Sequence, residues 1–262
     1  MTEVSAVKPR THITAITSGK GGVGKTFVAA NLAASLARQG RKVLVLDADL
    51  GLANLDVVLN LHPKITLHDV FTGKSTLVDA ILPAPGGFSV LLAGSGMVEY
   101  SRMTPEVREQ LQKVIDEVAP KYDHVLLDTG AGISDVVLYT VSLADDVIVV
   151  ATPEPTSLTD AYATIKVLVT TQGRREMGLL VNQVRRAGEG RTVKLQLQTV
   201  IDRYVNPGLD GFVRLDLLGE LPSDPAVREA VLRRQLLVDT MPGAPASVAM
   251  GVVATRMIDH ST

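Results

Sequence analysis

The stretch "HITAITSGKGGVGKT", residues 12–26, decides the fold. It begins with aliphatic and β-branched residues that are typical of a buried strand and then passes through a glycine-rich turn. In the segment that follows, residues 26–39, Val28, Leu32, Ala33 and Leu36 share one face at helical spacing, and Gly40 marks the expected end of the helix. A strand joined in this way to a helix predicts an α/β protein built on a parallel sheet.

The rest of the chain repeats this alternation of aliphatic strands and amphipathic helices. It predicts a doubly wound, mostly parallel sheet of seven to eight strands flanked by helices. We expect one domain over residues 1–262, with residues 1–11 as a flexible tail. The predicted strands are 12–17, 42–49, 88–94, 124–130, 146–152, 177–184 and 216–222. The predicted helices are 26–39, 104–118, 134–143, 156–171, 191–204, 224–236 and 246–258.

Composition excludes several classes of site. The 262 residues are 46% hydrophobic and carry a net charge of -2, which suits one well-packed domain and does not indicate a nucleic acid or an anionic membrane as partner. The absence of cysteine excludes disulfides, thiolate-bound zinc, iron–sulfur clusters and cysteine nucleophiles. The N-terminus has no apolar signal region, and no apolar run reaches the roughly 18 residues of a membrane span, so we expect a cytoplasmic protein.

The glycine-rich turn matches the P-loop pattern, Gly19-x4-Gly24-Lys25-Thr26, in the strand-to-helix context that this pattern requires. Backbone N–H groups of such a loop point at phosphate, and the helix N-terminus adds its positive end. We expect Lys25 to reach the β and γ phosphates and the Thr26 hydroxyl to bind Mg²⁺. The predicted nucleotide-binding residues of the loop are Gly19, Lys20, Gly21, Gly22, Val23, Gly24, Lys25, Thr26 and Phe27.

Three aspartates follow other predicted strands at the sheet edge where ligands of such folds bind. Asp128 ends "HVLLD" and is expected to hold the magnesium shell, directly or through water. Asp47 and Asp49, two residues apart, face the same side if the strand continues. Asp49 could then orient an attacking water and Asp47 could join the metal shell. Capping of the turn around Gly51 remains the alternative for this pair.

Lys20 is a second positive charge within the same loop. Two unit charges about 4 Å apart repel by about 4 kcal/mol at an effective dielectric of 20, so crowding Lys20 against Lys25 is costly without a polyanion between them. A loop whose N–H groups point inward tends to direct its side chains outward. Spacing alone leaves two interpretations open: a lysine aimed at another subunit, or a solvated loop lysine.

The string "GKGGVGKT" resembles the deviant Walker A motif of the MinD/ParA family of P-loop ATPases. The similarity continues through "DADLGLANLD", "LLDTGAGIS", "TPEPTSLTDAY" and "GELPSDPAVREAV", and within the family it is greatest to flagellar-number regulators of the FlhG/FleN type. The resemblance implies a weak ATPase that binds ATP or ADP with Mg²⁺ and forms a homodimer with ATP. Dimerisation or a partner would stimulate its hydrolysis.

The resemblance also implies roles for individual residues. Lys20 would cross the dimer interface to the partner's nucleotide, Asp49 would position the hydrolytic water, and Asp128 would be the Walker B aspartate. Asp47 would belong to the metal and switch region. The residues implied at the adenine base are Asn182, which would read it, and Pro222, Ser223 and Asp224, which would close over it. Phe27 stands where many relatives have a second threonine, and we expect little effect because the Thr26 ligand is intact.

The flagellar resemblance implies an FlhF-like GTPase, C-ring components or a flagellar transcription activator as partners. The N-terminus lacks the DQAxxLR-like stretch associated with stimulation of the GTPase. Two other functions stay open: a partition or positioning ATPase acting on DNA or the division machinery, and an ATP sensor or transcription antiactivator that does not hydrolyse ATP.

Two surfaces bear on those alternatives. The C-terminal segment, with Val248, Val252, Met257 and Ile258, favours a helix packed on the core over the basic amphipathic helix with which related proteins bind membrane, so stable membrane binding is not expected. A group of arginines could form a DNA-binding patch, although net charge and the lack of interleaved aromatic residues favour a solvated face. These are Arg174, Arg175, Arg185, Arg186 and Arg191.

Overall fold

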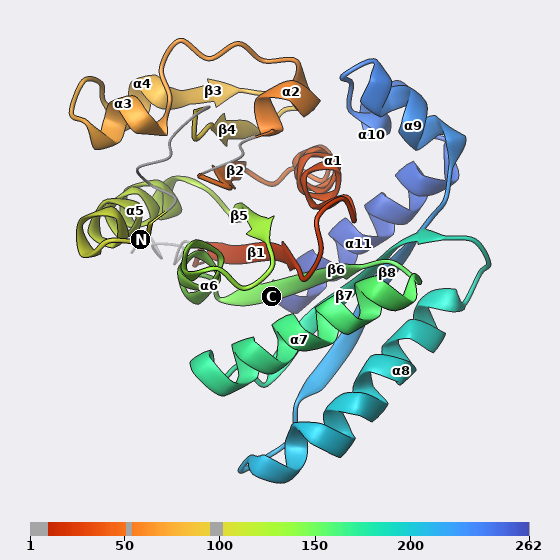
Figure 1. Cartoon of the computed structure of the whole chain (residues 1–262). Helices are drawn as coiled ribbons and strands as arrows, with labels where there is room; N and C mark the ends of the chain where they lie inside the picture. Colours follow the sequence, from red (N-terminus) through yellow and green to blue (C-terminus); the bar gives the residue numbers. More distant parts are fainter. Residues whose placement is uncertain (1–9, 51–53, 95–101, 262) are drawn as a thin grey trace, which may run out of the picture.

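A single eight-stranded sheet contains all the strands of the described residues. The computed structural model describes residues 10–50, 54–94 and 102–261, with side chains up to Asp259. The strand order is β3-β4-β2-β5-β1-β6-β7-β8 (Figure 1), and neighbouring strands are parallel except β3 and β4. The strands are β1 His12–Ser18, β2 Val43–Ala48, β3 Ile81–Pro83, β4 Ser89–Leu91, β5 His124–Ala131, β6 Asp146–Ala151, β7 Glu176–Val184 and β8 Arg214–Pro222.

Helices cover both faces of the sheet. One face is packed by α3 Leu67–Phe71, α4 Leu77–Ala80, α5 Pro105–Val118, α6 Asp135–Ser142, α7 Pro155–Gln172 and α8 Glu189–Tyr204. The other face is packed by α1 Lys25–Arg38, α2 Leu55–Leu59, α9 Pro225–Leu232, α10 Leu237–Thr240 and α11 Pro245–Ser261. Two short 3-10 helices, Ala119–Lys121 and Asn206–Gly208, complete the described elements.

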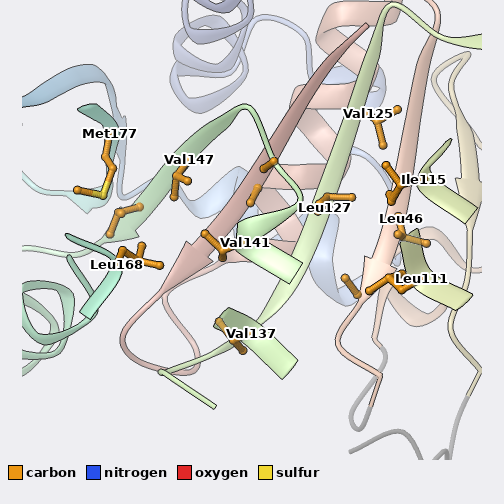
Figure 2. Packing of buried hydrophobic residues seen from close by; sticks show 14 of the residues in the cluster. Leu46, Leu111, Ile115, Val125, Leu127, Val137, Val141, Val147, Leu168 and Met177 are labelled. Carbon is orange, nitrogen blue, oxygen red and sulfur yellow. The ribbon is translucent and has the colours of Figure 1, made fainter. Parts of the chain in front are cut away.

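The alternation of side chains along the central strands builds two hydrophobic cores. In β5, Val125 and Leu127 point toward α5 and α6, where they pack near Leu111 and Ile115 (Figure 2), while Leu126 points to the α1 side. All three β5 residues are fully buried. Burying an aliphatic side chain of this size contributes about 1.5–3 kcal/mol, so the central strands are anchored from both faces. Their carboxyl ends provide a fixed base for the loops that follow.

The fold confirms the predicted doubly wound sheet. Each of the seven predicted strands and seven predicted helices is present with ends shifted by a few residues. The helix predicted over 224–236 is shorter, because Arg234 adopts a left-handed φ of 53° and Gln235 N donates to Ala230 O at 3.0 Å, which closes the turn. The short elements β3, α2, α3, α4 and α10 were not predicted, since segments of three to five residues carry too little periodicity.

The prediction that the C-terminal helix packs on the core through four named residues is partly wrong. Met257 is buried and Ile258 packs partly against the core, but Val248 and Val252 are 58% and 47% exposed. At 100° per residue these two valines lie on the outer face of α11. The residues that face the core are Ala246, Met250, Val253, Ala254 and Met257. No described helix combines the length and apolarity needed to cross a bilayer.

The predicted tail, residues 1–11, meets the body at its last two residues. Residues 1–9 lie outside the described residues. Arg10 Nη2 contacts Asp145 Oδ1 at 2.8 Å, and Thr11 Oγ1 donates to Tyr122 O at 2.8 Å. The chain is therefore held against the sheet from Arg10 onward.

Candidate nucleotide-binding site

The glycine-rich loop leaves β1 and begins α1 in a conformation that glycine makes possible. Gly24, at the N-terminus of α1, has a left-handed φ of 98°, and a Cβ there would lie 2.5 Å from Asn182 Nδ2. Asn182 in turn donates from Nδ2 to Val23 O at 2.8 Å. At the start of the loop, a Cβ on Gly19 would come within 2.1 Å of the Asp160 carbonyl oxygen in α7. The Asn182 side chain of β7 and the backbone of α7 thus lie against the two ends of the loop.

Lys25 lies across this loop as a nearly buried cation. Its side chain extends to Ser18, with Nζ 3.0 Å from Ser18 Oγ, and the residue is only 8% exposed. Burial lowers the pKa of Lys25, and the nearby carboxylates of Asp128 and Asp49 raise it. A cation held in this way, beside the N-terminus of α1, creates strong local attraction for an anion.

Asp47 and Asp128 face each other from adjacent strands. They are partners in the parallel register of β2 and β5, and both are almost completely buried. Burial raises the pKa of Asp47 well above its ordinary value, and Asp128 raises it further. Burial also raises the pKa of Asp128 to about 7, against the lowering effects of a Thr26 hydrogen bond and of Lys25. Two carboxylates held so close in a dry environment favour a cation beside them.

The donor set fits a magnesium ion. Within the described part of the chain, Asp128 Oδ1 is a buried acceptor without a hydrogen-bond partner, which is a costly arrangement unless a ligand completes it. Carboxylate and hydroxyl oxygens are the ligands that Mg²⁺ prefers. Asp47 is more committed, because Oδ1 accepts from Asp49 N and Oδ2 from Leu55 N, both at 3.3 Å. Asp47 therefore also binds the backbone on both sides of residues 51–53. Those residues lie outside the described part of the chain, so capping of the turn around Gly51 stays a prediction.

Lys25, Thr26 and Asp49 line a cavity of about 650 Å³ at the carboxyl ends of the central strands. Asp47 and Asp128 do not line it, but the residues that follow them, Ala48 and Thr129, do. Asp49 borders it beside Gly130, where a Cβ would lie 3.4 Å from the Asp49 carboxylate. The Phe27 side chain is buried in the core, so this residue can offer only its backbone. The predicted site residues that line the cavity are Gly21, Gly22, Gly24, Lys25, Thr26, Phe27 and Asp49.

Lys20 does not line that cavity. Its Nζ lies 3.0 Å from Thr156 Oγ1 and 3.4 Å from Glu154 Oε2, and its side chain is 40% exposed. Both partners belong to the β6–α7 connection and its first helical turn. The two lysines of one loop therefore point in different directions, one into the cavity and one to the protein surface.

The four residues that are predicted to contact the adenine base lie at the ends of β7 and β8. Asn182 supports the P-loop, and its Oδ1 also accepts from Gln183 N at 2.9 Å. Ser223 N donates to Val184 O at 2.7 Å, directly after Pro222 ends β8. Asp224 binds two helix N-termini, accepting from Ala226 N in α9 at 2.9 Å and from Ala246 N in α11 at 3.2 Å. Asp224 thus has a structural role that the sequence did not reveal.

Other residues contribute although the sequence did not single them out. Ser18 binds Lys25 Nζ and also donates to Lys20 O at 2.8 Å, so it connects the two lysines. Its signal was its position, immediately before the first glycine of the loop. Glu154 and Thr156 lie in "TPEPTSLTD", a segment recognisable as a strand end but without a pattern that pairs it with Lys20.

A P-loop between a buried strand and a helix, with a buried lysine and paired aspartates at the ends of neighbouring strands, defines a P-loop nucleotide-binding protein. The chain belongs to the family described as the CobQ/CobB/MinD/ParA nucleotide binding domain, whose model matches residues 14–238. The predicted family and fold class are thereby confirmed.

Individual relatives refine this assignment. The chain is 39% identical to antiactivator FleN of Pseudomonas aeruginosa, over 98% of this chain and 89% of FleN. It is 32% identical to the flagellum site-determining protein YlxH of Helicobacter pylori, over 96% of this chain and 83% of YlxH. The septum site-determining protein MinD of Pyrococcus horikoshii, solved in complex with Mg-ADP, has a TM-score of 0.76 and 28% identity, covering 96% of this chain and 99% of that chain.

Proposed function

We propose that this chain is an ATP-dependent dimerisation switch that hydrolyses ATP slowly in the cytoplasm and regulates the number, placement or assembly of flagella. The names of FleN and YlxH support the flagellar role. The observation that carries the switch is the separation of the two loop lysines. Lys25 is buried at the cavity, whereas Lys20 is held at the surface by Thr156 and Glu154.

Within one subunit, the loop amides and Lys25 bind the phosphates of ATP. The buried cation and the positive end of α1 support this assignment because both attract an anion. Thr26 and Asp128 would hold Mg²⁺, with Asp47 next to Asp128 on the adjacent strand. The ion supplies charge neutralisation on the phosphates when it is bound. Asp49, at the border of the cavity, accepts a hydrogen bond from the attacking water and orients it.

In the dimer, Lys20 leaves Thr156 and Glu154 and contacts the nucleotide of the other subunit. Phosphoryl transfer is accelerated mainly by positioning and by charge stabilisation, so a lysine supplied by a second subunit couples turnover to assembly. Hydrolysis then weakens the interface, and the subunits separate. Asn182 uses one Nδ2 hydrogen for Val23 O and one Oδ1 lone pair for Gln183 N, and its second Nδ2 hydrogen and second Oδ1 lone pair read the adenine. Pro222 to Asp224 border the base.

The partners of the dimer would be an FlhF-like GTPase, C-ring components or a flagellar transcription activator. The test uses Asp49→Ala, which should bind ATP but not turn it over. Size-exclusion chromatography with light scattering should show a dimer with Mg-ATP and a monomer with ADP. A pull-down with the ATP-bound variant should recover flagellar components that wild type in ADP does not. A monomer at saturating ATP would overturn the switch, and a dimer that recovers no flagellar component would overturn the flagellar role alone.

The second candidate is a positioning ATPase that acts on DNA or the division machinery, which the similarity to MinD favours. The five arginines do not form one patch. Arg174 and Arg175 precede β7, and the other three follow it, roughly 30 Å away for a nine-residue strand. Arg174 also donates to the carbonyls of Val141 and Asp145. Retention of DNA that needs ATP and falls steeply with salt would favour this candidate.

A further inference from the structure

A groove runs along the outer edge of the sheet, away from the nucleotide cavity. Its floor is β8, and α8 and α11 flank this strand from opposite faces (Figure 1). The strands β6, β7 and β8 separate the groove from β1, which places it about 14 Å across the sheet at 4.8 Å per strand. The groove has a volume of about 480 Å³ and is lined by Gly188, Arg191, Leu217, Gly219, Glu220, Ala249, Val252 and Arg256.

Aliphatic side chains are exposed along both walls of this groove. On α11, Ala249 and Val252 line it, and Val248 precedes Val252 by one helical turn. On α8, Leu195 is 63% exposed and lies one turn beyond Arg191. Water contacts these side chains, although the opposite faces of the same helices are fully packed on the sheet. Such a concentration of exposed aliphatic surface beside a groove is typical of an interaction site.

Two arginines frame the aliphatic surface. Arg191 stands on the α8 wall and Arg256 on the α11 wall, and no carboxylate of the described residues forms an ion pair with either. The carboxylate in the groove, that of Glu220, is already engaged, because it accepts from Gly188 N and Gly190 N at 2.8 Å each. The groove therefore offers positive charge on both sides of an aliphatic strip, and its complement is an aliphatic strip flanked by carboxylates.

The edge of β8 is closed to an added strand at several points. Gln198 of α8 binds the backbone of Val213 at 2.8 Å and of Leu215 at 3.0 Å. Arg256 Nη1 donates to Leu218 O at 2.7 Å, next to an irregularity in the pairing with β7. Side chains thus occupy the backbone groups that a partner strand would use. A ligand here must dock through its side chains, as an amphipathic helix does.

We propose that the groove between α8 and α11 binds an acidic amphipathic helix of a partner protein. Aliphatic side chains of that helix contact Val248, Val252 and Leu195, and its carboxylates pair with Arg191 and Arg256. The groove lies three strands from the P-loop, and its floor strand β8 ends at Pro222, which the proposed function places beside the base. Binding is therefore tested both without nucleotide and with Mg-ATP.

The probe is a synthetic helical peptide of about 18 residues, or five turns, with a leucine stripe flanked by glutamates. A second peptide with lysine in place of glutamate is its charge-reversed control. Binding is measured by fluorescence anisotropy and by chemical-shift mapping on the full chain, without nucleotide and with Mg-ATP. We expect saturable binding of the acidic peptide in both states, with shifts on α8, β8 and α11.

Substitutions in the groove distinguish specific binding there from nonspecific binding elsewhere on the protein. Val252→Asp and Arg191→Glu should each weaken binding of the acidic peptide at least roughly tenfold. The ATP affinity and the melting temperature should stay at wild-type values because both residues are exposed. The control is Val78→Asp, at a valine on α4 at the other end of the sheet that is 65% exposed against 47% for Val252, and this variant should bind like wild type.

Four outcomes would overturn the proposal. Two concern the acidic peptide: it does not bind saturably, or it binds the groove variants as well as it binds wild type. The other two are tighter binding of the lysine peptide and chemical-shift changes at the same groove residues when duplex DNA is added. Sedimentation of the nucleotide-free chain adds one more arm. A dimer that Val252→Asp dissociates would assign the groove to a second copy of this chain and contradict a partner helix.

Discussion

Asp47 and Asp128 are register partners on β2 and β5, and both are buried directly before Ala48 and Thr129, which line the phosphate cavity. Burial raises the pKa of each, and that of Asp128 reaches about 7. When no cation is bound, folding therefore buries carboxylate charge in a poorly solvated environment. The nucleotide-free protein should be less stable at neutral pH than its packing alone would allow.

This relationship predicts a pH-dependent effect of Asp128→Asn. A raised folded-state pKa means that the folded chain holds the proton more tightly than the unfolded chain. The stability contributed by protonation is complete below about pH 4 and is lost as the pH rises to about 7. Without nucleotide and metal, the variant should melt above wild type at pH 8 by several degrees, at roughly 2–4 °C per kcal/mol. The difference should shrink toward pH 4.

Thermal melts between pH 4 and 8 measure this effect. Mg-ATP provides the control, because a ligand that binds through Asp128 stabilises wild type more than the variant and should reduce or reverse the order. Equal melting curves of wild type and Asp128→Asn at pH 8 would contradict the role assigned to burial.

The two loop lysines should differ in function. Lys25→Ala removes the buried cation of the cavity and should weaken ATP binding at least roughly tenfold, since charge-assisted contacts contribute about 1.5–3 kcal/mol. Lys20→Ala should bind ATP nearly as wild type does but lose the turnover that depends on dimerisation. Isothermal titration and ATPase assays over a range of protein concentrations separate the two. If Lys20→Ala hydrolyses ATP normally at every concentration, Lys20 is a solvated loop residue.

The loop glycines should differ in their effect on stability. Gly24→Ala forces a side chain into a left-handed backbone and within 2.5 Å of Asn182, so it should lower the free energy of unfolding by about 1–3 kcal/mol. Gly21→Ala is the matched control in the same loop, because a Cβ there meets nothing within 4 Å and its φ is not positive. Its effect should stay within about 0.5 kcal/mol. Urea titration without nucleotide measures both, and similar values would argue against the described loop conformation.

Asp224 should be important for stability before any nucleotide binds. Its carboxylate caps α9 and also reaches the first turn of α11, and loss of one N-cap costs about 0.5–2 kcal/mol. Asp224→Ala should therefore lower the free energy of unfolding by about 1–3 kcal/mol, whereas Asp210→Ala, in an exposed loop, should change it little. Denaturation of the nucleotide-free chain tests this. If the denaturation midpoint of Asp224→Ala equals that of wild type, only the proposed role of Asp224 at the adenine base remains.

The sequence predicted those parts of the site that depend on local pattern. The glycine loop, Lys25 and the strand-end aspartates follow from spacing and strand periodicity, because a parallel sheet brings the carboxyl ends of its strands together. The contacts of Lys20 with Thr156 and Glu154 could not be predicted, since they join segments more than 130 residues apart. The same holds for the contact of Asp224 with Ala246 N, which joins residues 22 apart in the sequence.

The error at Val248 and Val252 has a related cause. Valine spacing identifies a helix, but the face that packs on the sheet depends on which turn of α11 meets β8. The face that packs on the sheet carries Ala246, Met250, Val253, Ala254 and Met257, and Val248 and Val252 lie on the opposite face. Hydrophobicity alone therefore assigned Met257 and Ile258 correctly but placed Val248 and Val252 on the wrong side of the helix.

The close approach of Gly19 to Asp160 leaves no free space between the start of the phosphate loop and the backbone of α7. α7 has 18 residues, a rod of about 27 Å at 1.5 Å per residue. Its last residue, Gln172, donates to Leu138 O in α6 at 2.7 Å. One continuous helix therefore joins the start of the phosphate loop to α6, so these two parts of the molecule are mechanically connected without sharing a strand.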